Sequence, residues 1–223
     1  MVSGRVYGAL RRVMRILMVA SDGMEFRGMP RRPDLHLAAK GVGAKCAAQA
    51  VDAALAEFAA EAIISTGFCG ALEPAMQIGD IVLGTEILNG SCRFPASLPQ
   101  SRRSSHTGLI ASIDHVAQSA AEKAQLRATG AIAVEMEAAG VAERASAHNL
   151  PFYCVKVVTD LAGEDMANDF NSALRPDGHF ATMEILRSSL RQPLVRIPEL
   201  IRLRKRCARS ALLLGEFIAD CRF

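Results

Sequence analysis

Acidic residues stand at the ends of apolar segments, where a carboxylate can act on a bound molecule. The stretch Ala131-Ile-Ala-Val-Glu-Met-Glu-Ala138 runs from apolar residues directly into Glu135 and Glu137. Because these two carboxylates are two residues apart, they cannot both face the same way. We expect one to point into a cleft while the other caps a helix or forms a pair elsewhere. A carboxylate beside a bound sugar can accept two hydrogen bonds from vicinal hydroxyls.

A further carboxylate, Asp160, ends the apolar segment Val157-Val-Thr-Asp160. Buried at a strand end, such a group loses contact with water and can hold a proton for donation. Glu25 follows the first apolar segment and is another candidate. Each has an ordinary alternative: Glu137 can stabilise a helix N-terminus, Asp160 can cap a strand, and Glu25 can be a solvated turn residue.

Alternating strands and helices must position these acids. Short apolar runs ending in Gly, Ser or Asp predict strands, and stretches with apolar residues at helical spacing predict helices. Gly67 and Gly70 are expected to bracket a tight turn, and residues 89–106 to form a loop. This order describes an α/β domain with sites at strand ends. The predicted strands are 16–20, 35–39, 61–65, 81–83, 109–112, 131–134 and 152–159, and the predicted helices are 44–60, 116–127, 135–148 and two at the end of the chain.

Composition limits the classes of function. The 223 residues, half of them hydrophobic, suit a single domain, which we place at 14–223 with residues 1–13 as an extension and Met14 as a possible start. The net charge of +3 comes from basic residues near both ends, so a nucleic-acid groove across the fold is not indicated. The six cysteines and five histidines show no metal-binding spacing, and no run suits a membrane span. We expect a cytoplasmic protein without a metal.

The order of the motifs resembles the purine nucleoside phosphorylase and nucleosidase superfamily. The Glu-Met-Glu stretch and the strand ending in Thr-Asp carry this resemblance. It is extended by Gly41-Val-Gly-Ala-Lys-Cys-Ala-Ala48, Ser65-Thr-Gly-Phe-Cys-Gly-Ala-Leu72 and Ile78-Gly-Asp80. The resemblance covers about residues 14–175 and implies a three-layer α/β/α fold with a mixed central sheet, nucleoside phosphorylase-like. It also implies a nucleoside substrate, no cofactor and a homodimer.

The resemblance assigns roles residue by residue. Glu137 would bind the ribose 2′ and 3′ hydroxyls, and Asp160 would protonate N7 of the leaving purine. Glu25 would activate water, although this alignment needs a shift of one residue. The remaining predicted contacts with substrate are Met136 under the sugar, the backbone of Val116 and Ala117 at the base, and Glu135, Thr66, Gly67 and Phe68 in the pocket.

The attacking group can be water or phosphate. Phosphorolysis needs fixed donors for a dianion, and the phosphorylases that resemble this chain carry Arg-x-Gly-Ser where it has Ser65-Thr-Gly-Phe68. Arg27 is the one candidate that could supply a charge. We therefore predict an adenine-releasing nucleosidase, with a phosphorylase on the same substrates as the alternative and a non-catalytic nucleoside-binding protein as another.

Two features refine this prediction. The short stretches between Glu25 and Gly41 and between Gly90 and Gly108, together with residues 116–123, make the chain similar to the hopanoid-associated branch, which implies adenosylhopane as substrate. The segment 194–219 interleaves apolar and basic residues. It predicts a basic amphipathic helix that either rests on the inner face of an anionic membrane or packs on the domain with a solvated basic face.

Overall fold

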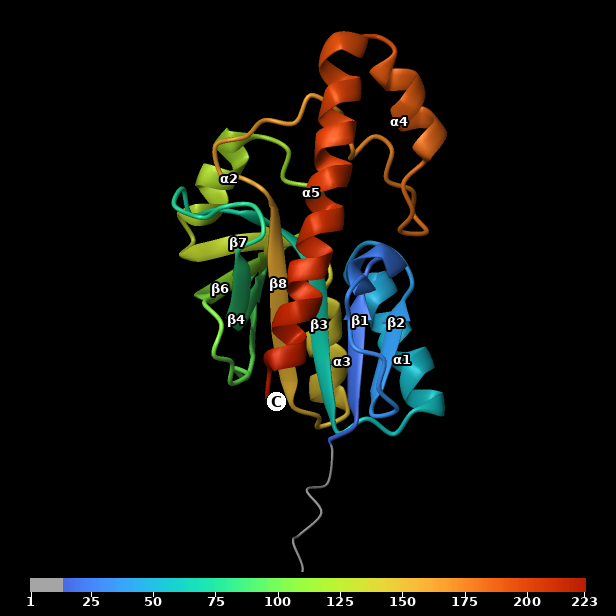
Figure 1. Ribbon diagram of the computed structural model, residues 1–223, viewed down its shortest axis with the longest axis vertical. Coiled ribbons are helices and arrows are strands. Elements are labelled where there is room, and N and C mark those ends of the chain that lie inside the picture. The colour runs from blue at the N-terminus through green and yellow to red at the C-terminus, as the bar shows by residue number, and fades with distance from the viewer. Residues whose placement is uncertain (1–13) are drawn as a thin grey trace, which may run out of the picture.

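The computed structural model describes residues 14–223 and has three layers (Figure 1). A mixed β-sheet lies in the middle. Helices α1 (Ala44–Glu57) and α3 (Ala138–Ala147) cover one face, and α5 (Pro193–Asp220) covers the other. The expected α/β/α fold with a mixed central sheet is confirmed. The predicted extension, residues 1–13, lies outside the described residues.

The sheet in the described part of the chain has eight strands. Parallel pairs join β1 to β2 and β3, β3 to β8, and β6 to β4 and β7, while β7 lies antiparallel to β3 and β8 antiparallel to β4. The pairings of β3, β8, β4, β6 and β7 therefore close a ring. The strands are β1 (Ile16–Ala20), β2 (Leu35–Ala39), β3 (Ala62–Ala71), β4 (Ile81–Asn89), β5 (Cys92–Pro95), β6 (His106–Ser112), β7 (Ala131–Glu135) and β8 (Phe152–Asp160).

Both faces of the central strands are buried, which explains their continuous apolar runs. On β1, Leu17 and Val19 pack in the core that includes Val141 of α3, whereas Met18 packs in a second core with Phe217 of α5. Alternate side chains of a strand point to opposite faces, so one apolar run supplies both cores. This arrangement fixes α1, α3 and α5 on the sheet.

Several predicted boundaries are wrong. Gly67 and Gly70 do not bracket a turn, because β3 continues through both and pairs with β8 along that length. The predicted loop 89–106 contains strand β5, which pairs with β4. The predicted helix 116–127 is shortened to α2 (Ala120–Arg127), and the predicted helix 135–148 begins only at Ala138 because Glu135 ends strand β7. The two closing helices are present.

The last helix has two parts with different surroundings. Its C-terminal part packs on the sheet, with Leu214 and Phe217 buried. Its N-terminal part extends beyond the sheet beside α4 (Thr182–Ser189), and we call residues 182–206 the arm (Figure 1). No helix within residues 14–223 has the length and apolar character needed to span a membrane.

Candidate active site

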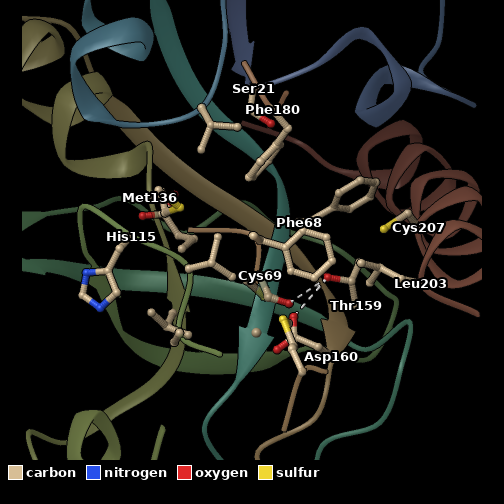
Figure 2. Close-up of a pocket in the computed structure, with 18 of the residues that line it drawn as sticks. Ser21, Phe68, Cys69, His115, Met136, Thr159, Asp160, Phe180, Leu203 and Cys207 are labelled. Atoms are coloured by element: carbon tan, nitrogen blue, oxygen red, sulfur yellow. Dashed lines mark hydrogen bonds between the residues drawn. The ribbon is translucent and has the colours of Figure 1, made fainter. Parts of the chain in front are cut away.

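One cavity gathers most of the predicted site residues. Its volume is about 330 Å³, a size that suits a small molecule. It lies where the ends of β3, β7 and β8 meet helix α5, and Figure 2 shows Asp160 and Phe68 close together with Leu203 and Cys207 approaching from that helix. The predicted residues that line it are Glu25, Phe68, Val116, Ala117, Glu135, Met136, Glu137 and Asp160.

Glu25 is buried and held by four hydrogen bonds, so it is not a solvated turn residue. It lies in η1 (Gly23–Phe26), a short 3-10 helix that follows β1. One carboxylate oxygen accepts the N–H and hydroxyl of Ser21, at 2.7 and 2.9 Å, and the N–H of Asp22, at 3.1 Å. The other accepts the N–H of Phe68 at 2.9 Å. These neutral donors fix the carboxylate at the wall of the cavity.

Glu135 and Glu137 make different hydrogen bonds, although both line the cavity. One Glu135 oxygen accepts the N–H groups of Glu137 and Ala138, at 3.0 and 2.8 Å, and so caps the first turn of α3. The same oxygen lies 2.8 Å from Nζ of Lys156, which is completely buried. Glu137 instead accepts the N–H of Gly43 at 3.0 Å, and its other oxygen is 3.9 Å from Lys156 Nζ.

Burial governs the protonation of Glu137. It raises the pKa of this carboxyl group, and the nearby charges of Glu135 and Glu25 add to the rise while Lys156 opposes it, leaving a pKa of about 7. Burial alone would lower the pKa of Lys156, but the carboxylates of Glu135 and Glu137 outweigh it and raise this pKa. Lys156 therefore stays charged, while Glu137 titrates near neutral pH.

Asp160 is held by a buried lysine that sequence reasoning missed. Lys123 of α2 is completely buried, and its Nζ lies 2.5 Å from one Asp160 oxygen and donates to the carbonyl of Leu161 at 2.8 Å. The hydroxyl of Thr159 approaches the other Asp160 oxygen at 3.4 Å (Figure 2). One signal in the sequence could have indicated this burial. Lys123 lies three residues before Leu126, so the lysine shares a helix face with an apolar residue.

Of the predicted substrate contacts, Thr66 and Gly67 do not line the cavity. The carbonyl of Thr66 accepts a 3.0 Å hydrogen bond from Lys156. Gly67 has φ +115°, and a Cβ there would lie 2.5 Å from a Glu25 oxygen. A Cβ at Gly70 would lie 2.7 Å from an Asp160 oxygen. These glycines make room for two acids rather than for a turn.

The Val116 backbone, which lines the cavity, is engaged by a neighbouring side chain. Its N–H donates to the side chain of Asn171 at 2.8 Å, and its carbonyl accepts from the same amide at 3.0 Å. A backbone N–H is a single donor, so in this arrangement the part of the Val116 backbone left for a base is the second lone pair of its carbonyl. Ala117 lines the cavity beside it, as does His115, which bonds to Asp114 and Glu122. Hydrogen bonds to these two carboxylates raise the pKa of His115.

One wall of the cavity is apolar. Its side chains come from the loop after β8 and from the arm, and Phe68 of β3 adds to them. In the described part of the chain, no Arg or Lys lines the cavity, and Arg27 is exposed outside it. The apolar residues of this wall are Met166, Phe170, Phe180, Ile185 and Leu203.

Comparison with known proteins places this geometry in a family. The model of the Phosphorylase superfamily matches residues 26–181, which is most of the chain. The chain belongs to the Phosphorylase superfamily. Among curated members, it is 27% identical over 192 residues to the 5′-methylthioadenosine/S-adenosylhomocysteine nucleosidase of Tolumonas auensis, covering 72% of this chain and 83% of that protein. The enzyme of the same name from Oceanobacillus iheyensis is 26% identical, covering 66% and 76%.

Solved structures of this superfamily share the fold. A mutant of the Helicobacter pylori nucleosidase, with 5′-methylthioadenosine in its active site, superposes with a TM-score of 0.68 at 14% identity, covering 93% of this chain and 97% of that one. Futalosine hydrolase from the same organism gives 0.67 at 14% identity with the same coverage. The Neisseria meningitidis nucleosidase gives 0.62 at 20% identity, covering 92% and 100%. The nucleoside phosphorylase-like fold is therefore confirmed.

Proposed function

We propose that the protein hydrolyses the N-glycosidic bond of a 5′-substituted adenosine and releases adenine. The observation that carries this proposal is the cavity lining, which combines four carboxylates with no Arg or Lys among the described residues. Phosphorolysis needs cationic donors for a dianion, and carboxylates repel one. Water needs no such donors. The names of the curated relatives support adenosines with a 5′ substituent as the substrate class.

Asp160 is the proposed general acid. It would give its proton to N7 of the purine as the C1′–N9 bond breaks, and the bonding electrons would leave with the base. General acid catalysis of this kind contributes roughly 10²–10⁴-fold. The ammonium of Lys123, 2.5 Å away, would stabilise the carboxylate that Asp160 becomes after donation. Lys123 is thus a positioning and charge-balancing residue rather than one that touches the substrate.

Glu25 and Glu137 would act on the sugar side. Glu25 would accept a proton from the water whose oxygen attacks C1′, and its four hydrogen bonds hold it ready for this step. Glu137 would accept hydrogen bonds from the ribose 2′ and 3′ hydroxyls, with Met136 packed under the ring. These roles consume one proton at Glu25 and supply one from Asp160, so the reaction is balanced.

The apolar wall supports an apolar 5′ substituent. Phe180, Ile185 and Leu203 would surround a group attached to the 5′ carbon, while the polar wall holds the ribose and base. The resemblance to the hopanoid-associated branch makes adenosylhopane, in hopanoid biosynthesis, the most specific candidate. A homodimer, implied by the resemblance, and a cytoplasmic location, expected from the cysteines and the composition, remain predictions.

The test is an assay of free adenine from a panel of adenosines that carry methylthio, homocysteine or triterpenoid groups at the 5′ carbon, with and without inorganic phosphate. We expect adenine release at equal rates in both conditions, together with a free reducing sugar. Turnover that depends on phosphate and yields a sugar 1-phosphate would favour the phosphorylase. Tight nucleoside binding without turnover of any panel member would favour a binding protein.

A further inference from the structure

The arm exposes an unusual amount of apolar surface. Of the ten large hydrophobic side chains that are exposed among residues 14–223, seven lie in it, and Leu194 is 90% exposed. Clustered apolar surface of this kind is rare on soluble proteins unless it binds something. The spacing on each helix is three or four residues, so each set shares one face, except that Val195 directly follows Leu194. The seven are Met183, Leu186 and Leu190 around α4, and Leu194, Val195, Ile197 and Ile201 on α5.

The charge of the arm is strongly one-sided. The arm has two acidic residues: Glu184 is exposed, and Glu199 is buried. Five basic side chains are exposed beside the apolar faces: Arg187, Arg191, Arg202, Arg204 and Lys205. A second copy of this surface would bring like charges together, whereas an anionic surface would be attracted by them. The arm therefore suits an anionic partner with an apolar interior.

The arm is a supported structure and not a frayed end. Glu199 accepts the N–H groups of Ala167 and Asn168, both at 2.8 Å. Arg206 forms two hydrogen bonds with Glu164, at 2.7 and 2.8 Å. Because these bonds tie the arm to the loop after β8, its apolar side chains are presented to solvent on a fixed scaffold.

We propose that the arm docks on the surface of an anionic lipid bilayer. Helices with Leu on one side and Lys or Arg beside it lie in the boundary between headgroups and acyl chains. The described helices are not long and apolar enough to span a membrane, so docking would be interfacial. The C-terminal part of α5, included in the sequence-based prediction, is excluded because Leu214 and Phe217 are buried on the sheet.

Docking would bring the cavity next to the membrane. Ile201 is exposed and Leu203 lines the cavity, and residues two apart on a helix lie about 200° around its axis from each other. The same relation holds for Met183 and Ile185 of α4. The membrane-facing helices thus also form the apolar wall. Entry of a substrate with a lipid-like 5′ group from the bilayer rests on the proposed function. Docking of the arm on the membrane does not.

The test is flotation of the full-length protein with vesicles of phosphatidylcholine, with and without phosphatidylglycerol. We expect binding at least about tenfold stronger to the anionic vesicles, and weaker binding as salt is raised. The double variant Leu190→Ser/Leu194→Ser should lose this binding by at least tenfold. Its matched control is Leu98→Ser, which changes an exposed leucine outside the arm and should bind like the wild type. The melting temperature should be unchanged in both.

Three outcomes would overturn docking. The first is no preference of the wild type for anionic vesicles. The second is equal flotation of the double variant and the wild type, with the fold of each checked by melting temperature. The third is a wild type that does not bind vesicles but forms a dimer in sedimentation velocity, and a double variant that is monomeric. This result would assign the surface to a second copy of the chain. Because the assay needs no turnover, its failure is distinct from failure of the proposed function.

Discussion

The two ends of the polar cavity wall are built alike and yet stabilise their acids differently. At one end Gly67 makes room for Glu25, and at the other Gly70 makes room for Asp160. Glu25 is surrounded by neutral N–H and O–H donors. Asp160 is held by the ammonium of Lys123.

This difference matches two kinds of proton chemistry. Neutral donors orient a carboxylate without cancelling its charge, so Glu25 can still accept a proton from water. A buried ammonium cancels the charge that Asp160 carries after it has given up a proton. The two ends therefore suit a base and an acid, which is the division of labour that hydrolysis needs.

The largest expected effect is at Asp160, the proposed general acid. Asp160→Asn removes the donated proton, and we expect kcat for adenine release to fall by roughly 10²–10⁴. Nucleoside affinity should change by less than about tenfold, since the lost interaction belongs to the transition state. The matched control is Asp52→Asn, which changes an exposed carboxylate paired with Arg144 on the α1–α3 layer. A kcat for Asp160→Asn within tenfold of the wild type would remove Asp160 as the acid.

The next prediction compares how much the partners of Asp160 and Glu25 contribute to the free energy of unfolding. Lys123→Met leaves Asp160 without its buried partner, and we expect a loss of about 3–5 kcal/mol in the free energy of unfolding, measured with urea. Glu25→Gln should cost less, about 1–3 kcal/mol, because only hydrogen bonds to neutral donors are disturbed.

A double variant gives this comparison its control. Lys123→Met/Asp160→Asn removes both charges, so most of the loss caused by Lys123→Met should be recovered. Two results would show that the ion pair does not stabilise Asp160. One is that the losses caused by Lys123→Met and by Asp160→Asn simply add in the double variant, and the other is that Lys123→Met costs no more than Glu25→Gln.

The order of motifs allowed the fold to be predicted, and eight of the ten predicted site residues line the cavity, because strand-end acids follow recognisable apolar runs. Glu135 and Glu137 differ in their hydrogen-bond partners, as predicted, but both line the cavity. The turn predicted at Gly67 and Gly70 was wrong, because glycine is typical of turns. The acids that need the space at these glycines are remote in sequence. Gly67 serves Glu25 and Gly70 serves Asp160.

The partners of the two buried lysines could not be assigned for a related reason. Lys123 follows Glu122 in a polar helix, where a lysine is ordinarily solvated. Lys156 stands within the apolar strand β8, which hints at a buried charge but does not show that Glu135 is its partner. Both ion pairs join residues of different elements, so they depend on packing that no local pattern records.

The surroundings of Glu137 combine those of Glu25 and Asp160. Its carboxylate accepts a neutral N–H and also lies 3.9 Å from a buried ammonium. Its pKa of about 7 is above the usual 4.5, so between these pH values the folded protein holds a proton that the unfolded chain has lost. This contribution to stability is complete below pH 4.5 and is lost as pH rises through 7.

Glu137→Gln should remove that pH dependence and give the smallest effect. Relative to the wild type, the variant should gain on the order of 1–3 kcal/mol in the free energy of unfolding as pH rises from 4.5 to 8, measured by urea titration at each pH. Nucleoside affinity of the wild type should rise over the same range, since the ionised carboxylate is the better acceptor for ribose hydroxyls, and the variant should lack this rise. Parallel stability curves for the two proteins would mean that Glu137 is ionised throughout this pH range, which would contradict the raised pKa.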